Sequence, residues 1–150
     1  MLSMDALMKS ISRTHRCANA YRAAALPDQD LKGCQHIYIF HICRAPGISQ
    51  EQLAQKICVN KSSVTRQLSS LENKGFVERR PDADDRRVLR AYPTEKAKAV
   101  YPAVRACMVQ WNDLLLEDFS EEERTLILSM LSRIADKAVT LVKGAAEKEA

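Results

Sequence analysis

The feature that most constrains this chain is a run of helix and strand signals between residues 47 and 94. Ser49 and Gln52 form the Ser-x-x-Gln pattern, in which the two side chains satisfy free backbone N–H groups at a helix start. The apolar residues that then repeat at helical spacing are Leu53, Ala54 and Ile57. A short break at residues 58–60 ends with Asn60, a residue type that caps helix starts well. The run therefore predicts two short helices joined by a tight turn.

The second of these helices has two different faces. The apolar residues at positions i, i+4 and i+7 are Val64, Leu68 and Leu71. The residues that lie away from this stripe are Ser62, Thr65, Arg66 and Ser69. Small hydroxyl side chains with an arginine fit closely into a nucleic-acid groove and can hydrogen-bond to base edges and phosphates. Gly75 ends the helix, because glycine favours the position after a C-cap.

Two strand-like runs follow Gly75. They span residues 76–80 and 87–92, and residues 81–86 form a polar turn between them. Two short strands directly after such a helix are typical of a winged helix. We therefore expect a mainly helical fold with a helix-turn-helix, a two-stranded wing and further helices at both ends of the chain.

This stretch resembles the multiple-antibiotic-resistance regulator (MarR) family of winged-helix transcription factors. The matching segments are Pro46-Gly47-Ile48-Ser49-Gln50, Leu53-Ala54, Lys61-Ser62-Ser63-Val64-Thr65-Arg66, Leu71-Glu72, Gly75-Phe76-Val77 and Asp82-Ala83-Asp84-Asp85-Arg86-Arg87. In order and length the resemblance covers nearly the whole chain, although the specific motifs lie in this third of it. Three residues depart from the family pattern: Cys58 replaces a common turn glycine, Ala83 a common wing proline and Pro93 a common leucine. Of these, Cys58 is the one placed to alter the turn.

The recognition face and the resemblance together predict the residues that bind DNA. In the family an arginine of the wing enters the minor groove, and an aspartate two residues earlier orients it, which corresponds to Arg87 and Asp85 here. Arginine suits a narrow minor groove because the negative potential is strongest there. The alternative is a surface turn of mixed charges. The complete predicted set is Asn60, Lys61, Ser62, Ser63, Thr65, Arg66, Ser69, Arg79, Asp85, Arg86 and Arg87.

The distribution of charge agrees with this interpretation. The net charge is +4, but residues 61–105 contain eleven Lys/Arg against six Asp/Glu, whereas residues 106–150 contain five against nine. The positive excess thus falls on the predicted recognition helix and wing, as a phosphate-binding surface requires. Asp5 interrupts the N-terminal apolar stretch, and the five cysteines contain no CxxC pair. We therefore expect no signal peptide, no disulfide scaffold and a cytoplasmic protein.

The rest of the chain is predicted to be helical. A first helix covers about residues 2–26, and the apolar run at residues 31–44 indicates a helix buried on several sides, with a strand at 37–42 as the alternative. Asp28 or Asp30 is expected to cap this second helix. Thr94 is expected to cap a long helix to about residue 118. Ser120 then begins a capping box, and the last helix reaches about residue 146.

Apolar stripes on the terminal helices predict a homodimer. The stripe of the last helix consists of Ile127, Met130, Leu131, Ile134, Ala138, Leu141 and Val142. A small winged core cannot cover such stripes, and a second copy is the simplest cover; the alternative is that they fold over their own domain. We expect an N-terminal dimerisation helix in residues 1–30, a DNA-binding domain in 31–93 and C-terminal dimerisation helices in 94–150.

The resemblance also implies how such a protein works. It implies a homodimeric repressor on near-palindromic double-stranded DNA, relieved by a small, often phenolic or anionic effector that binds between the DNA-binding and dimerisation regions. Arg22, Tyr38 and His41 are the candidate effector-binding residues.

Four residues of the second helix, Cys34, His36, His41 and Cys43, look like a metal site in the sequence. On a helix, however, Cys34 pairs with His41 and His36 with Cys43, and the two pairs are rotated by roughly 200° at about 100° per residue. Four ligands therefore cannot converge on one zinc ion, and we expect neither a metal nor another cofactor. Two of these residues with a partner helix, for example through His15, remain an alternative.

Other classes of function are disfavoured. The sequence contains no paired-carboxylate site, no Gly-x-Ser-x-Gly, no phosphate loop and no His-Glu-x-x-His, so we do not expect an enzyme. A redox sensor remains an alternative, for which Cys17 is the nearest candidate, although a buried cysteine is more often a small apolar residue. A winged helix that only contacts proteins is less favoured, because it does not explain the hydroxyl-and-arginine face.

Overall fold

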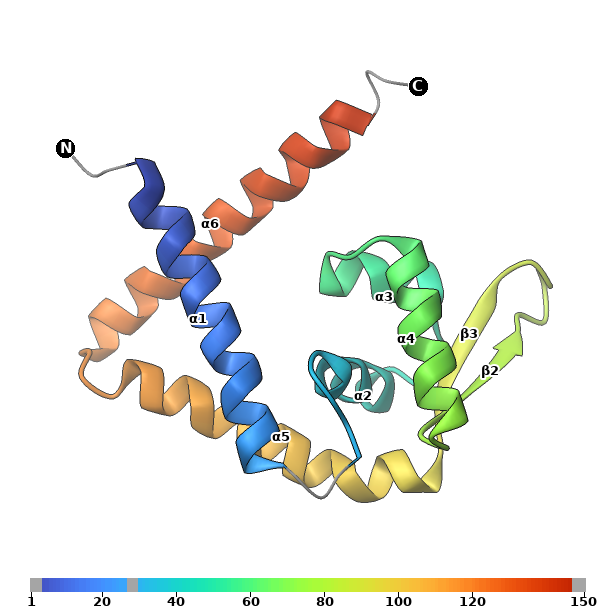
Figure 1. Ribbon diagram of the computed structural model, residues 1–150. Helices are drawn as coiled ribbons and strands as arrows, with labels where there is room; N and C mark the ends of the chain where they lie inside the picture. The colour runs from blue at the N-terminus through green and yellow to red at the C-terminus, as the bar shows by residue number, and fades with distance from the viewer. Residues whose placement is uncertain (1–3, 27–29, 147–150) are drawn as a thin grey trace. The chain divides into compact units, whose positions relative to one another are not determined.

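The computed structural model describes residues 4–26 and 30–146 of the chain (Figure 1). The elements are α1 (Met4–Ala25), α2 (Gln35–Arg44), β1 (Ile48–Ser49), α3 (Gln50–Ile57), α4 (Lys61–Asn73), β2 (Val77–Pro81), β3 (Leu89–Pro93), α5 (Glu95–Leu116) and α6 (Glu121–Ala146). The chain forms two compact units, Met1–Trp111 and Asn112–Ala150, and the boundary falls within α5. The expected mainly helical winged helix-turn-helix is confirmed. None of the described helices is long and apolar enough to cross a membrane.

The helix-turn-helix forms for the local reasons that the sequence indicates. Ser49 Oγ accepts a hydrogen bond from Gln52 N at 3.1 Å, and Gln52 Oε1 accepts one from Ser49 N at 3.0 Å, which completes the capping box of α3. Asn60 caps α4, because its Oδ1 accepts a hydrogen bond from Ser63 N at 2.8 Å. Cys58 adopts the left-handed conformation, with φ 58° and ψ 47°. The turn therefore keeps the backbone that a glycine would take there, at the conformational cost of a side chain.

The end of α4 leads directly into the wing. The N–H of Phe76 donates to Leu71 O at 2.9 Å and that of Gly75 donates to Glu72 O at 2.9 Å, so the helix ends in a Schellman motif. Gly75 has φ +78°, as the left-handed position in this motif requires. Phe76 is itself fully buried and belongs to the core, so β2 begins one residue later than expected.

The sheet has three antiparallel strands, where the sequence predicted two. Their order is β1-β3-β2, and Ile48 of β1 lies opposite Ala91 of β3. Strand β1 is only two residues long, so it carries no alternating pattern that a sequence reading could detect. It joins the wing to the corner between α2 and α3.

The core of the first unit lies where α2, α3, α4 and the sheet meet. The largest fully buried side chains are Tyr38, Phe76, Ile39, Ile42, Leu53, Leu68, Leu71, His36, Val64 and Val104. The predicted apolar stripe of α4 is therefore confirmed. The opposite face of this helix is exposed to solvent. Trp111 of α5 contacts Tyr21 of α1, with ring centroids 4.9 Å apart.

Helix α2 begins four residues later than predicted. Asp30 and Gly33 both have positive φ, 53° and 54°, and such left-handed residues cannot continue a helix. The N-cap residue of α2 is Cys34, which makes no side-chain cap, so the expectation that Asp30 caps this helix is wrong. Asp28 lies outside the described residues. The alternative of a strand at 37–42 is excluded, since these residues are helical.

The last two helices begin as expected. Thr94 Oγ1 accepts from Ala97 N at 3.3 Å at the start of α5. Ser120 Oγ accepts from Glu123 N at 3.2 Å, and Glu123 Oε2 accepts from Ser120 N at 2.9 Å, so the capping box of α6 is present. Helix α5 ends at Leu116, slightly before the predicted position.

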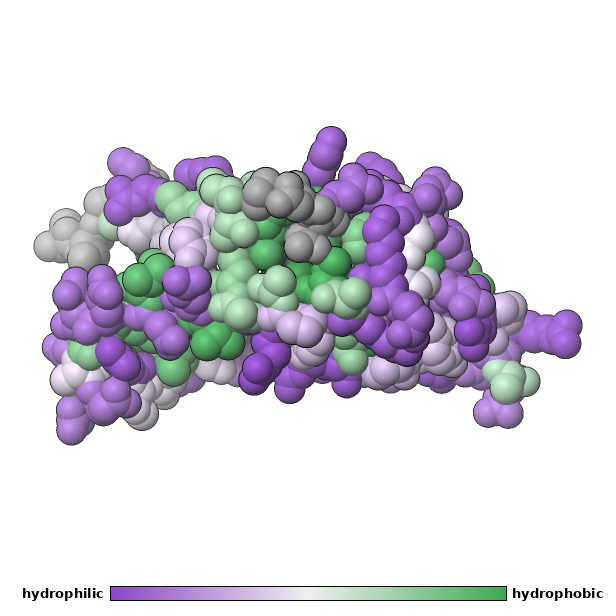
Figure 2. All heavy atoms as spheres, turned by 90° about the horizontal axis from the view of Figure 1, so that it is seen from below, coloured by the Kyte–Doolittle hydropathy of each residue, from purple (hydrophilic) through white to green (hydrophobic). Residues whose placement is uncertain are grey.

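No α6 side chain between Glu121 and Lys143 is buried. The predicted stripe is accordingly open: Met130 is 49% exposed, Leu131 46%, Ile134 37%, Leu141 61% and Val142 71%. In the first unit, Leu7 and Met8 of α1 are also exposed. Figure 2 shows hydrophobic residues reaching the surface among hydrophilic ones.

Candidate nucleic-acid interface

The outer face of α4 carries most of the predicted contact residues. The exposed side chains among them are Asn60, Lys61, Ser62, Thr65 and Arg66, while Ser63 and Ser69 are half-buried. Asn60 uses its side-chain oxygen in the helix cap, and Arg66 Nη2 lies 3.5 Å from Ser63 Oγ. The helix thus presents hydroxyls and two cations to solvent, which suits a polyanion.

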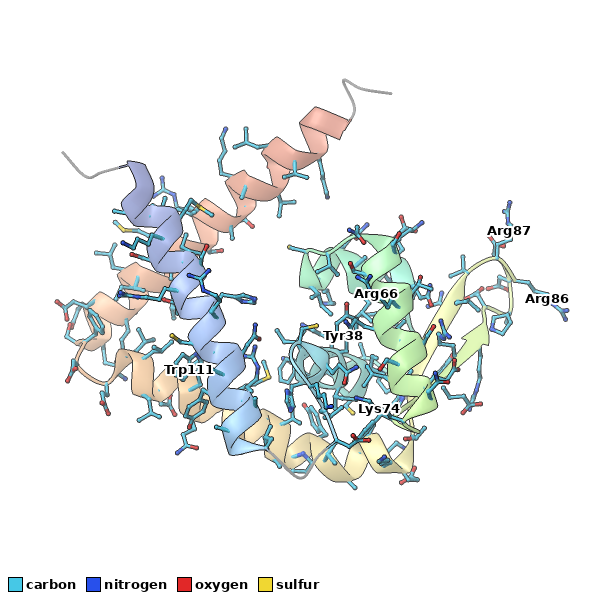
Figure 3. All side chains as sticks on the ribbon, viewed as in Figure 1. Tyr38, Arg66, Lys74, Arg86, Arg87 and Trp111 are labelled. Carbon is cyan, nitrogen blue, oxygen red and sulfur yellow. The ribbon has the colours of Figure 1, made fainter. Side chains whose placement is uncertain are left out.

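The wing holds a second group of cations beside this helix. Figure 3 shows Arg86 and Arg87 at the tip of the β2–β3 hairpin, pointing away from the rest of the unit. The Arg87 side chain is 91% exposed, yet its Nε lies 3.1 Å and its Nη2 3.2 Å from the Asp85 carboxylate. Arg87 also lowers the pKa of Asp85 through this hydrogen bond. The guanidinium is therefore exposed to solvent and paired with the Asp85 carboxylate.

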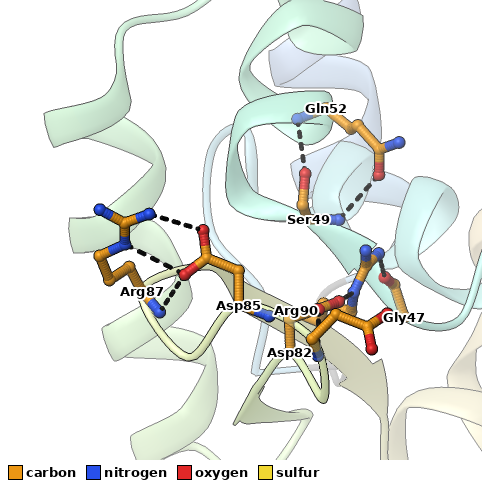
Figure 4. A network of polar contacts seen from close by, with 8 residues as sticks. Gly47, Ser49, Gln52, Asp82, Asp85, Arg87 and Arg90 are labelled. Carbon is orange, nitrogen blue, oxygen red and sulfur yellow. Dashed lines mark hydrogen bonds and ion pairs between the residues drawn. The ribbon is translucent and has the colours of Figure 1, made fainter.

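The loop between β2 and β3 is organised by Asp82, a residue that the sequence reading did not select. One carboxylate oxygen accepts from Asp84 N at 2.9 Å and Asp85 N at 3.0 Å, and the other is paired with the Arg90 guanidinium (Figure 4). These bonds, led by that to Arg90, lower the pKa of Asp82 to about 2. Arg90 Nη1 in turn donates to Gly47 O at 2.8 Å, so the wing is fastened to the corner where α3 begins.

Arg79 faces inward, unlike Arg86 and Arg87 at the tip of the wing. Its side chain is only 17% exposed and its Nη2 lies 2.7 Å from Glu72 Oε2 and 3.1 Å from Ser69 Oγ. Its Nη1 lies 3.5 Å from Gln50 Oε1. The hydrogen bond from Arg79 lowers the pKa of Glu72. The Arg79 guanidinium is thus occupied within the fold, and Ser69 accepts one of its hydrogen bonds. Gln50 is a further residue of this surface that the sequence analysis did not predict.

The three candidate effector residues do not form one open site. Tyr38 is 1% exposed and Arg22 6%, while His41 is half-buried. Burial raises the pKa of Tyr38 and lowers that of Arg22 and of His41. Arg22 donates to Asn19 Oδ1, and its Nε is buried without a hydrogen-bond partner among the described residues. In this conformation a ligand reaches neither Tyr38 nor Arg22 without movement of neighbouring side chains.

The Cys/His residues are scattered in the structure. Within residues 4–26 and 30–146, no group of three or more His, Cys, Asp or Glu side chains could hold a metal ion. His36 is fully buried, Cys34 and Cys43 are half-buried, and Cys17 and Cys58 are exposed.

These elements define a winged helix-turn-helix with one polar, cation-bearing face. The sequence model of the MarR family matches residues 35–89, from α2 through the wing. The uncharacterized HTH-type transcriptional regulator YybA of Bacillus subtilis (strain 168) is 31% identical over 131 residues, 87% of this chain and 87% of that protein. This chain belongs to the MarR family of transcriptional regulators.

Solved structures agree with this assignment. A crystal structure of MarR is 32% identical, covers 94% of this chain and 96% of its own, and has a TM-score of 0.77. A regulator from Listeria monocytogenes complexed with 26mer DNA has a TM-score of 0.79, with 91% of this chain and 89% of that chain covered. At 22% identity this second likeness concerns the fold alone.

Proposed function

We propose that this chain is a homodimeric, sequence-specific regulator that binds double-stranded DNA with α4 in the major groove and the wing in the adjacent minor groove. The observation that carries the proposal is the single exposed face on which α4 presents Lys61, Thr65 and Arg66 beside a wing tipped by Arg86 and Arg87. An exposed recognition helix next to exposed arginines suits phosphates and base edges. This face is already present in the chain without DNA. The Listeria regulator of the same fold was solved with a 26mer DNA, which supports DNA binding by a chain of this fold.

The wing supports the proposal through the geometry of Arg87. A fully flexible arginine would lose side-chain entropy on entering a groove, whereas the Asp85 carboxylate already restricts this one. The other residues that we propose to contact DNA are Asn60, Lys61, Ser62, Ser63, Ser69, Asp85 and Arg86. For Arg79 we propose an indirect role, through the residues of α4 that it contacts.

The open stripe of α6 supports a homodimer. Fully burying one Leu or Ile side chain contributes about 1.5–3 kcal/mol, and roughly half of that remains to be gained by side chains that are about half exposed. Five such residues from each of two copies would contribute on the order of 10 kcal/mol before the cost of association. We therefore assign α6 and α1, within segments 94–150 and 1–30, to dimerisation, and segment 31–93 to DNA binding.

Repression and its relief complete the proposal. A dimer bound across a promoter would exclude the transcription machinery, and a small phenolic or anionic effector would release it. The candidate effector residues Arg22, Tyr38 and His41 come from α1 and α2. Arg22 Nε has no hydrogen-bond partner in the described part of the chain, so it is the group among them that an anion would satisfy best. We expect the protein to act in the cytoplasm and without a metal or other cofactor.

Binding to duplex DNA at several salt concentrations tests the DNA-binding part. The proposal predicts a steep fall of affinity with salt, since each neutralised phosphate releases counterions. An affinity that does not respond to salt would overturn it.

Sedimentation of Ile134→Glu tests the dimer. A charge in the middle of the stripe should yield monomers, whereas Ser132→Glu, which lies on the opposite face of α6, should leave the dimer intact. Dimers of equal stability in both variants would remove α6 from the interface.

A further inference from the structure

A chain of polar contacts connects the wing to the exposed face of α4. Arg79 of β2 contacts Glu72 and Ser69 of α4 and also reaches Gln50, the first residue of α3. Gln50 Nε2 in turn lies 3.4 Å from Thr65 Oγ1. Side chains of α3 and β2 thus contact the hydroxyl groups of Thr65 and Ser69 on α4.

The chemistry of these groups fixes the direction of every hydrogen bond. An ionised Glu72 can only accept, and its pKa is lowered by Arg79. A guanidinium can only donate, so Arg79 requires the oxygen of the Gln50 amide. The amide nitrogen of Gln50 must then point toward Thr65, because the two ends of an amide have opposite roles. Thr65 Oγ1 therefore accepts inside the protein, and its proton remains free to point outward.

The Ser69 hydroxyl also accepts a hydrogen bond within the protein and keeps its proton free, because it contacts the Arg79 guanidinium directly. Arg79 Nη2 donates to Ser69 Oγ at 3.1 Å, so this hydroxyl also accepts internally. A hydroxyl that accepts from a cation becomes a stronger donor and a weaker acceptor for its next partner. Both hydroxyls are thereby prepared to donate to whatever lies against α4.

We propose that Arg79 and Gln50 are positioning residues that make Thr65 and Ser69 hydrogen-bond donors toward the bases. This inference rests on the proposed function, since it requires α4 to lie in the major groove. There, guanine presents N7 and O6, thymine presents O4 and adenine presents N7 as acceptors, whereas cytosine presents only an amino donor. Adenine also carries an amino donor beside its N7. The protein should accordingly accept guanine, thymine or adenine and exclude cytosine at the bases that these hydroxyls contact.

Gln50→Glu reverses the direction of the hydrogen bond between residue 50 and Thr65 and changes the shape of the side chain little. A carboxylate at this position still accepts from Arg79, but it now also accepts from Thr65, whose proton must turn inward. The Thr65 oxygen then faces the bases as an acceptor and favours cytosine or adenine. Gln55→Glu is the matched control, because it adds the same charge to the exposed surface of α3 without a contact to Thr65.

The experiment is selection from a library of duplex DNA with a randomised centre, using the full chain and each variant. The wild type should deplete cytosine at one or two positions in each half-site. Gln50→Glu should enrich cytosine or adenine at a Thr65-contacted position, and Gln55→Glu should retain the wild-type sequence. Thr65→Val, which keeps the shape and removes the hydroxyl, should bind the wild-type-selected duplex about two- to tenfold more weakly. It should also lose sensitivity to 7-deazaguanine or 7-deazaadenine at that position.

The possible failures are distinguishable. If the wild type enriches no sequence, the proposed function is overturned together with this inference. If the wild type enriches a sequence and Gln50→Glu selects the same bases with lower affinity, only the inference is overturned. Circular dichroism of each variant separates either result from unfolding, and a folded Gln50→Glu is expected because glutamate is favourable at a helix start.

Discussion

Gly47→Ala should destabilise the junction between the wing and the helix-turn-helix. Gly47 has φ +86°, and a Cβ at this position would lie 3.2 Å from Tyr92 Cε1 and 3.2 Å from Tyr92 Oη. The Tyr92 ring is also contacted on one face by the Arg80 guanidinium, 4.8 Å from the ring centroid. The ring therefore cannot move away without disturbing this contact.

The expected loss of stability in Gly47→Ala has two parts, a net backbone cost and a collision with the Tyr92 ring. A left-handed backbone costs an L-residue about 1–2 kcal/mol, and the loss of unfolded-state freedom returns about 0.4–1 kcal/mol. Overpacking against a constrained ring adds about 1 kcal/mol or more. We expect Gly47→Ala to lower the free energy of unfolding by roughly 2 kcal/mol.

Urea denaturation of Gly47→Ala and Gly33→Ala separates the two parts. Gly33 has φ +54°, but a Cβ added to it would meet no atom of residues 4–26 or 30–146 within 4 Å, so Gly33→Ala carries the backbone cost without the collision. The loss at Gly47 should exceed that at Gly33 by about 1 kcal/mol. Equal losses would refute the idea that close packing of Gly47 on Tyr92 holds the wing.

Three further predictions concern the proposed interface. Arg87→Ala should weaken DNA binding and reduce the log–log salt slope by roughly one per half-site; an unchanged affinity would remove Arg87 from the contacts. Thr65→Ala or Arg66→Ala should cost about 1–3 kcal/mol on the selected sequence and less on random DNA, and equal losses on both would indicate phosphate contacts. Asp82 has a pKa of about 2 when folded against an ordinary 3.8, so its stabilising bonds are present above about pH 4 and are lost as the pH falls toward 2. Asp82→Asn should therefore make stability less dependent on pH in this window, as acid titration of the unfolding midpoint would measure.

The parts of the fold that the sequence predicted correctly depend on neighbouring residues. The capping boxes at Ser49 and Ser120 and the glycine stop at Gly75 each involve groups within a few positions of one another. The buried stripe of α4 follows from helical periodicity alone. Signals of this kind do not depend on the rest of the fold.

The parts that it missed depend on contacts between distant segments. Strand β1 exists because Ile48 meets Ala91 across the sheet, and a two-residue strand has no periodicity. The inward direction of Arg79 depends on how β2 packs against α4, which places Glu72 and Ser69 within its reach. The late start of α2 follows from two left-handed residues, Asp30 and Gly33. Glycine takes this conformation routinely and aspartate only occasionally, so the sequence does not mark Asp30 as one of them.

The same distinction applies to the proposed interface. The hydroxyl-and-cation face of α4 is a periodic feature, and the structure leaves it exposed as expected. The roles of Asp82 and Arg90 in fastening the wing were not foreseeable, since Arg90 joins Asp82 to the distant Gly47 carbonyl. Fixing the wing in this way restricts where Arg86 and Arg87 can reach.

The central claim is that the protein binds DNA as a dimer through α4 and the wing. Hydroxyl-radical footprinting on the DNA that flanks the gene of this protein tests that claim most directly. A dimer that reads with α4 and the wing should protect two half-sites on one face of the duplex, with centres about one helical turn, roughly 34 Å, apart. Arg87→Ala should lose the minor-groove protection that flanks the half-sites and keep the protection of the sugar-phosphate backbone beside the major groove that α4 occupies. Protection of a single isolated segment, or of none at all, would contradict the account.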